Sequence, residues 1–281
     1  MAKQSAFPES QPAGIKPASL MRRVSTALVY GLAVLGALWW GVRPTGVLFG
    51  AMAGFAAAEF YAMERRERRL PNEPFGIIAA TAMPIAAAFW GLPGLSAVVT
   101  ALIAASLLWH TLFVHVQTAD TAETVFGAVY TGFLLAYLVL IRTFEQGLLL
   151  SVVLVVSVWV NDMAAYFVGS LAGRHKMVPH ISPKKSWEGF VAGALACTLV
   201  WLAAPLLPGL DLSRWLALAA GVAVALSSVV GDLAESRMKR EAGVKDSGSS
   251  LPGHGGFLDR LDSLILVCLV AYWVLWWGGV R

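Results

Sequence analysis

Long apolar runs recur along this sequence from residue 24 to residue 278, and most are separated by only short polar segments. A helix needs about 20 mostly apolar residues to cross the hydrocarbon core of a bilayer, and about nine runs approach that length. The runs cover residues 24–41, 46–63, 75–91, 95–114, 124–141, 148–168, 190–206, 215–233 and 263–278. They lack the alternation of a barrel strand, so they predict helices. The expected fold is an all-α polytopic integral membrane protein.

The composition agrees with one membrane-embedded unit. Of the 281 residues, 58% are hydrophobic and 14% are charged, whereas an average soluble domain carries roughly 25% charged residues. Residues 1–19 are polar and rich in proline, so we expect a disordered cytoplasmic lead there. A cleavable signal peptide is not expected, because Arg22 and Arg23 precede a run long enough to span. Residues 20–281 should form a single transmembrane domain.

Basic residues are distributed unevenly between alternate polar segments. With a cytoplasmic N-terminus and about nine spans, all but four of the 21 Lys and Arg residues fall on the cytoplasmic side. The four on the other side are Arg43, Arg142, Arg214 and Arg281. Cytoplasmic loops collect Lys and Arg, so this pattern predicts a cytoplasmic N-terminus and an external C-terminus. The net charge of +4 thus reflects topology, and we expect no nucleic-acid partner.

Two long polar segments on the predicted cytoplasmic side, residues 169–189 and 234–262, are where chemistry is expected. Asp232 and Glu235 stand three residues apart where the second segment begins, and Asp259 and Asp262 repeat that spacing at its end, so each pair shares a helix face. Carboxylates beside a bilayer are costly unless they pair or bind a cation, and an oxygen-rich cluster suits magnesium. Helix capping and ion pairs with nearby arginines could explain each acid alone. The whole set favours a metal site.

A glycine-rich stretch lies between these two carboxylate pairs. Its backbone can approach a ligand closely, and its positive charge suits phosphate oxygens. The residues are Lys245, Ser247, Gly248, Gly253, His254, Gly255 and Gly256. Turn formation by the glycines and helix capping by His254 are the alternative. Beside a magnesium cluster, a phosphate cradle indicates a nucleotide or pyrophosphate substrate.

The other long segment supplies cations against a single acid. Its tightest group would suit an anionic headgroup or a nucleotide phosphate. The residues of this group are Ser182, Pro183, Lys184, Lys185, Ser186, Trp187 and Glu188. Positive-inside topology is the alternative for the more scattered cations. Asp162 lies inside an apolar run, with Tyr166 on the same helix face, so both should face a polar cavity. Glu59, in the second run, could equally pair within the bundle or mark a cavity.

At these positions the chain resembles the phosphatidate cytidylyltransferase family, also called CDP-diacylglycerol synthases. The C-terminal signature of that family is matched in order and spacing by Ser236, Lys239, Arg240, Lys245, Asp246, Pro252, Gly253, His254, Gly255, Gly256, Asp259, Arg260 and Asp262. A second element is matched by residues 181–189, with Ser186 where threonine is usual. Residues 161–166 are similar to a third element, with Met163 in place of a small hydroxyl residue. The signature region therefore covers residues 161–263.

The resemblance implies that residues 20–281 form a transmembrane catalytic domain that transfers CMP from CTP to phosphatidate, giving CDP-diacylglycerol and pyrophosphate. It implies magnesium, with room for a second cation, held by Asp232, Asp259 and Asp262. The residues it assigns to catalysis are Lys245, Asp246, His254 and Asp259, and those it assigns to substrate binding are Ser182, Lys184, Lys185, Arg240, Gly255, Gly256 and Arg260. It also implies a homodimer. A bacterial plasma (inner) membrane, with the active site facing the cytoplasm, is the expected location.

Two other functions fit parts of the pattern. A CTP-dependent transferase for an ether or isoprenoid lipid would share the nucleotide and metal residues, because hydrophobicity does not define the lipid cavity. A transporter could use Asp162, Asp232 and Glu235 along an ion path. Against transport, the sequence has no visible repeat with paired broken helices, and its charges concentrate in two segments on one face.

Overall fold

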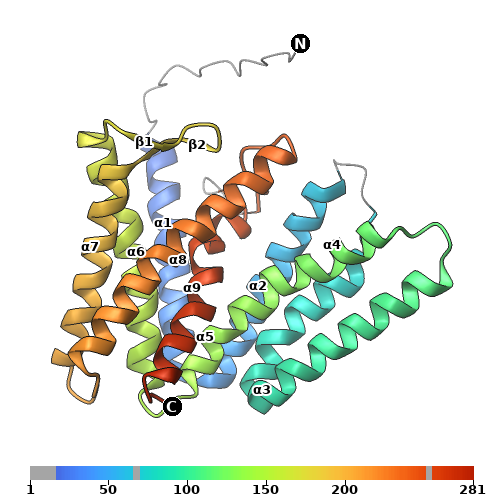
Figure 1. Cartoon of the computed structure of the whole chain (residues 1–281), viewed down its shortest axis with the longest axis horizontal. Helices are drawn as coiled ribbons and strands as arrows, with labels where there is room; N and C mark the ends of the chain where they lie inside the picture. Colours follow the sequence, from blue (N-terminus) through green and yellow to red (C-terminus); the bar gives the residue numbers. More distant parts are fainter. Residues whose placement is uncertain (1–16, 66–69, 251–254) are drawn as a thin grey trace.

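Helices make up most of the chain (Figure 1). The computed structural model describes residues 17–65, 70–250 and 255–281, with side chains from residue 25 onward. The helices are α1 (Pro17–Trp40), α2 (Val42–Glu64), α3 (Glu73–Leu112), α4 (Thr118–Ala128), α5 (Leu134–Arg142), α6 (Gly147–Ala172), α7 (Trp187–Ala203), α8 (Arg214–Glu241) and α9 (Leu258–Trp277). A π-helical turn, Val129–Phe133, joins α4 to α5, and a 3-10 turn, Ala204–Leu206, follows α7.

Six helical segments in the described ranges are long and apolar enough to cross a membrane. They are α2, α3, α4 through α5, α6, α7 with its 3-10 turn, and α8. The described side chains of α1 give a shorter apolar helix, Ser25–Trp40. Each predicted apolar run falls largely within a helix, within one arm of a bent helix or, for 124–141, within α4, the π-helical turn and α5. This agreement confirms the helical membrane class. The count of nine spans and the sides of the two termini stay predictions.

Helix α3 combines two predicted runs because it bends at Gly91. The φ of 62° and ψ of −148° at Gly91 are not helical, and glycine adopts this backbone region at no steric cost. Pro93 follows near the start of the second arm, where its missing amide hydrogen removes no helical hydrogen bond. The 40 residues of α3 therefore form two arms.

The predicted lead and polar segments differ from the structure at their edges. Residues 1–16 of the expected disordered lead lie outside the described residues, but α1 already begins at Pro17. Residues 169–189 were expected as a loop, yet strands β1 (Lys176–Val178) and β2 (Ser182–Ser186) form an antiparallel hairpin there, a small exception to the all-α expectation. Similarly, α8 continues to Glu241 and α9 starts at Leu258, so helix occupies both ends of the predicted loop 234–262. Hydropathy marks where the apolar surface ends, whereas hydrogen bonding continues the helix beyond it.

Helix α9 lies between two groups of helices (Figure 1). It packs extensively on α8 on one side and on α5 on the other. The other extensive contacts join α6 to α7, α7 to α8, and α2 to α3. The β1–β2 hairpin, the end of α8 and the end of α2 lie at one end of the molecule, and the C-terminus lies at the opposite end. The first turn of α9 is thus placed where the two groups meet, at the end that carries the hairpin.

Candidate functional site

A cavity of about 1000 Å³ lies at the hairpin end of the molecule. Its walls come from α1, α6, the β2 strand, α8 and the first turns of α9. Polar side chains on α6 line it together with aromatic ones, including Asp162 and Tyr166, as the sequence predicted for this helix face. The remaining polar lining comes from the hairpin lysines and from both carboxylate-bearing helices.

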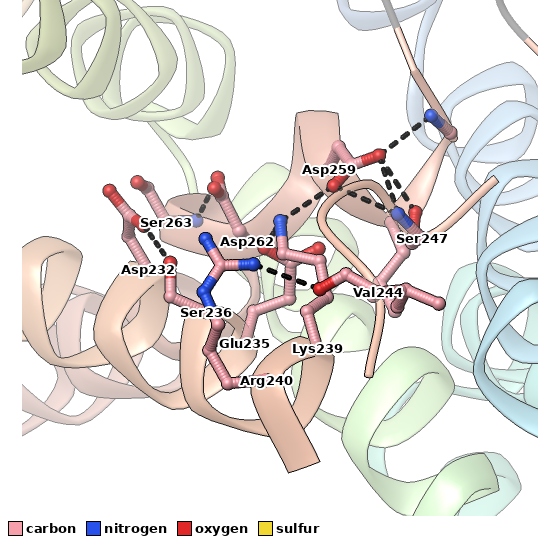
Figure 2. Close-up of polar contacts among 12 residues, drawn as sticks. Asp232, Glu235, Ser236, Lys239, Arg240, Val244, Ser247, Asp259, Asp262 and Ser263 are labelled. Carbon is pink, nitrogen blue, oxygen red and sulfur yellow. Dashed lines mark hydrogen bonds and ion pairs between the residues drawn. The ribbon is translucent and has the colours of Figure 1, made fainter. Parts of the chain in front are cut away.

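Four aspartates from three helices line this cavity: Asp162 of α6, Asp232 of α8, and Asp259 and Asp262 of α9. Asp162 accepts a hydrogen bond from the Asn161 Nδ2, 3.2 Å away, and that amide also donates to Ser228 of α8. Figure 2 shows the Asp232 and Asp262 carboxylates on the same side of the α8–α9 pair. The sequence prediction that acids from the last two helices converge is confirmed for these two residues.

The cavity also carries cations. Lys185 on β2 lies with its Nζ 2.6 Å from Asp232 Oδ2, and both side chains are half-buried. Lys184 and Arg260 line the cavity as well and are exposed. Both lysines belong to β2, which lies at one end of the helix bundle (Figure 1), and both line the cavity with the aspartates. Opposite charges facing one water-accessible space can bind phosphate oxygens and a cation together.

Asp259 is oriented differently from Asp262, although the two are three residues apart on α9. Figure 2 shows its carboxylate turned toward Ser247. The Ser247 amide and hydroxyl lie 3.0 and 2.9 Å from Asp259 Oδ2, and the Gly256 amide donates to the same oxygen at 2.8 Å. Lys239 Nζ lies 2.6 Å from Oδ1. Both oxygens of Asp259 are therefore held by neighbouring donors.

Lys239 joins two buried acids. Its ammonium lies 2.7 Å from Glu235 Oε2 and 2.6 Å from Asp259 Oδ1, and Glu235 is fully buried. Asp259 precedes the apolar run 263–278, and there burial alone would raise its pKa. The Lys239 ammonium, with the Gly256 and Ser247 donors, instead holds the pKa of Asp259 below its ordinary value. The charged form of Asp259 is thus the stable one in this network.

Ion pairing with arginine, the alternative for these acids, is seen at the edge of the site. Arg237 pairs with Glu241 at 2.8 Å on the exposed surface of α8. Arg240 donates to the Val244 carbonyl at 2.8 Å. Of the acids that line the cavity, Asp232 pairs with Lys185 and Asp259 with Lys239. The cavity remains large enough for a ligand.

The oxygen-rich wall has the donor chemistry of a magnesium site. As the side chains stand, no three Asp, Glu, His or Cys side chains in the described ranges are grouped as a metal site. Asp232 pairs with Lys185, and Asp259 is occupied by its own donors. Asp232 and Asp262 fit a hard cation best, because they line the cavity from adjacent helices. The metal assignment stays a prediction.

The structure divides the predicted site residues into two groups. Those that line the cavity are Lys184, Lys185, Asp232, Asp259, Arg260 and Asp262. Those described away from its lining are Ser182, Arg240, Lys245, Asp246, Gly255 and Gly256. Ser182 pairs with Val178 in the hairpin, and Lys245 and Asp246 are exposed just after α8. His254 lies outside the described residues. The roles assigned to all these residues remain predictions.

Two contributors were not identified as site residues from the sequence. Lys239 was part of the signature and of the charge pattern, but nothing in its spacing showed that it would bridge Glu235 and Asp259. Glu59 comes from α2, and its carboxylate contacts the glycine-rich stretch 188 residues later. The sequence signal for Glu59 was its position inside an apolar run, where an acid needs a polar partner.

The fold and the site define a polytopic helical membrane protein with a charge-lined cavity at one end of its bundle. The chain belongs to the cytidylyltransferase family, whose profile matches residues 21–277. A phosphatidate cytidylyltransferase of Pseudomonas aeruginosa is 35% identical over 92% of this chain and 99% of its own length. Phosphatidate cytidylyltransferases of Mycobacterium bovis and Staphylococcus epidermidis are 42% and 40% identical over 56% and 53% of this chain. These two matches span about half the length of those relatives, 51% and 56%.

Proposed function

We propose that this protein transfers CMP from CTP to phosphatidate, producing CDP-diacylglycerol and pyrophosphate. The observation that carries the proposal is the cavity in which acidic and basic side chains face one space at the end of an apolar bundle. A reaction that joins a nucleotide phosphate to the phosphate of a lipid needs both a charged and an apolar environment. The family and the phosphatidate cytidylyltransferase of Pseudomonas aeruginosa, which matches nearly the full chain, support this reaction.

The chemistry requires little covalent participation by the protein. A phosphate oxygen of phosphatidate attacks the α-phosphorus of CTP, the bond from that phosphorus to the bridging oxygen breaks, and pyrophosphate leaves. The attacking oxygen is already anionic near neutral pH, so no strong base is needed. Lys184, Lys185 and Arg260 would hold the phosphates in line and stabilise the charge that develops.

We further propose that Asp232 and Asp262 hold magnesium in this cavity. Bound there, the ion would neutralise charge on the phosphates, and a second cation could share that role. Asp259, which the family resemblance also assigned to the metal, would then act mainly by fixing Ser247, Gly256 and Lys239. Removal of divalent cations by EDTA should stop turnover, and adding magnesium back should restore it.

The location we propose is a bacterial plasma membrane, with the cavity facing the cytoplasm and the chain acting as a homodimer. The charge pattern supports the orientation, because the hairpin and the end of α8 carry most of the nearby Lys and Arg. The exposed apolar side chains along α1, α3 and α7 suit contact with lipid.

The test is an assay of the purified chain in detergent with CTP, magnesium and a panel of lipid acceptors. We expect pyrophosphate and CDP-lipid in equal amounts with diacyl phosphatidate. Turnover with an ether lipid or an isoprenoid phosphate, and none with phosphatidate, would show that the lipid acceptor is not phosphatidate. Tight binding of all components without pyrophosphate release would contradict the transferase function itself.

A further inference from the structure

Glu59 is a buried acid on α2, far from the signature region in sequence. Glu59 is 7% exposed, and among the described residues it is not one of those that line the cavity. Its Oε2 accepts hydrogen bonds from the Ser247 hydroxyl at 3.0 Å and the Leu258 amide at 2.9 Å. Its Oε1 accepts one from the Ser250 hydroxyl at 2.6 Å. A carboxylate inside an apolar helix is costly, and these three donors offset that cost.

Two glycines leave the space that Glu59 occupies. A Cβ on Gly248 would lie 2.6 Å from Glu59 Oε1, and a Cβ on Gly256 would lie 2.2 Å from Oε2. One helical turn before Glu59, the ring of Phe55 stacks on Phe257 with centroids 4.9 Å apart. The same face of α2 therefore contacts residues 247–250 and residues 255–258. These glycines allow the close approach of α2, in addition to any contact with phosphate.

The contacts of Glu59 continue to the proposed active site. The Ser247 hydroxyl lies between two carboxylates, 3.0 Å from Glu59 and 2.9 Å from Asp259. Asp259 in turn meets Lys239, which meets Glu235 (Figure 2). A displacement of Glu59 would change the position of Ser247, and with it the donors that orient Asp259 at the start of α9.

We propose that Glu59 is a positioning residue, which anchors residues 247–250 and 255–258 to α2 and thereby sets Asp259 for catalysis. The anchoring follows from these contacts alone, whereas its effect on turnover rests on the proposed function. The Glu59 carboxylate acts through Ser247 and touches no reacting atom. Its loss should therefore lower kcat while leaving the KM for CTP nearly unchanged.

The experiment compares Glu59→Ala with Glu59→Gln, which keeps one acceptor oxygen for Ser247 and Leu258. Hydrogen–deuterium exchange is measured on peptides that cover residues 244–250 and 255–260, and steady-state kinetics are measured with CTP and phosphatidate. The matched controls are Glu73→Ala and Glu73→Gln, because Glu73 pairs with Arg65 away from this network. A Ser247→Ala variant and the Glu59→Ala, Ser247→Ala double variant complete the set.

We expect Glu59→Ala to speed exchange in both peptides and to lower kcat about 100-fold with KM changed less than about twofold. Glu59→Gln should recover most of the rate. The double variant should be no slower than the worse single variant, because both changes break the same connection. Unchanged exchange in both peptides, or an unchanged kcat, in Glu59→Ala would overturn the proposal. If exchange is faster in Glu59→Ala than in the unaltered chain, but the unaltered chain never forms CDP-lipid, the proposed function fails and the anchoring holds.

Discussion

The helices α2 through α5 and the helices α6 through α9 use their interiors in opposite ways. In the first group, Gly46, Gly50 and Gly54 of α2 face α3 so closely that a Cβ on Gly50 would lie 2.7 Å from the Thr81 carbonyl oxygen. In the second group, the helices surround a cavity of about 1000 Å³ that contains aspartates and lysines. Close packing excludes water and ligands, whereas an open polar interior admits them. The comparison indicates that the first group supports the fold and the second carries the chemistry.

Glu59 is the exception that links the two groups, since it is an acid of α2 that contacts the segment leading into α9. If the division is correct, substitutions that remove charge from the cavity should reduce turnover far more than they reduce stability. Substitutions in the α2–α3 contact should do the reverse.

The largest effect is expected for Asp232→Asn. Because Asp232 lines the cavity and pairs with Lys185, loss of its charge should lower kcat/KM for CTP about 1000-fold. Formation of labelled CDP-lipid measures the rate, and size-exclusion chromatography checks the fold. Asp211→Asn is the matched control, because Asp211 is exposed between α7 and α8. An Asp232→Asn protein with half of the normal rate would remove this residue from the chemistry.

A smaller loss of activity, about 100-fold, is expected for Asp259→Asn, which leaves the buried Lys239 with one carboxylate fewer. This variant should also lose stability, by about 3 kcal/mol, because Lys239 and Asp259 form a buried pair. Thermal unfolding in detergent is measured beside turnover. Glu241→Gln, which breaks the exposed pair with Arg237, should change neither the thermal unfolding nor the turnover. Loss of stability without loss of rate would make Asp259 purely structural.

An effect of about tenfold is expected for Lys184→Gln, and it should appear in the KM for CTP. Lys184 lines the cavity on the exposed side of the hairpin, so it would contribute charge to phosphate binding without fixing the reacting atoms. The difference in KM for CTP between Lys184→Gln and the unaltered protein should shrink as the salt concentration is raised. Arg214→Gln, an exposed cation at the start of α8, serves as the control. A KM that is unchanged at low salt would argue against phosphate contact.

The smallest effect on kcat is expected for Gly50→Ala, in the closely packed group. The added methyl would meet the Thr81 carbonyl and the Ile85 side chain, so stability should fall by about 1–3 kcal/mol while the folded protein keeps its kcat. Gly36→Ala is the control, because a Cβ on Gly36 of α1 meets nothing within 4 Å. If Gly50→Ala lowered kcat at full stability, the two groups would not divide fold from chemistry as described.

The sequence was sufficient to predict the helices and the convergence of Asp232 with Asp262. Hydropathy reports lipid-length runs directly, and a three-residue spacing places acids on one helix face. The ends of α8 and α9 were not predictable in the same way, since both helices continue past their apolar runs. The β1–β2 hairpin was missed because its residues include Pro183 and two lysines, which carry no strand pattern.

Side-chain directions within the site depended on contacts that no local pattern contains. Asp259 and Asp262 have the same predicted face, but Ser247, Gly256 and Lys239 hold Asp259 away from its neighbour. The contact between Glu59 and Ser247 joins residues 188 positions apart. Such pairings follow from how α2 and α9 pack, and a single sequence shows only that an acid in an apolar run needs some partner.

The pair formed by Lys185 and Asp232 has a consequence for the order in which ligands associate. A triphosphate that attracts the lysine toward itself would free the aspartate for a cation, and a cation on the aspartate would release the lysine for the triphosphate. Each ligand would then raise the affinity of the other by the same factor, as thermodynamic linkage requires. In the absence of both ligands, the two side chains offset each other's charge within the cavity.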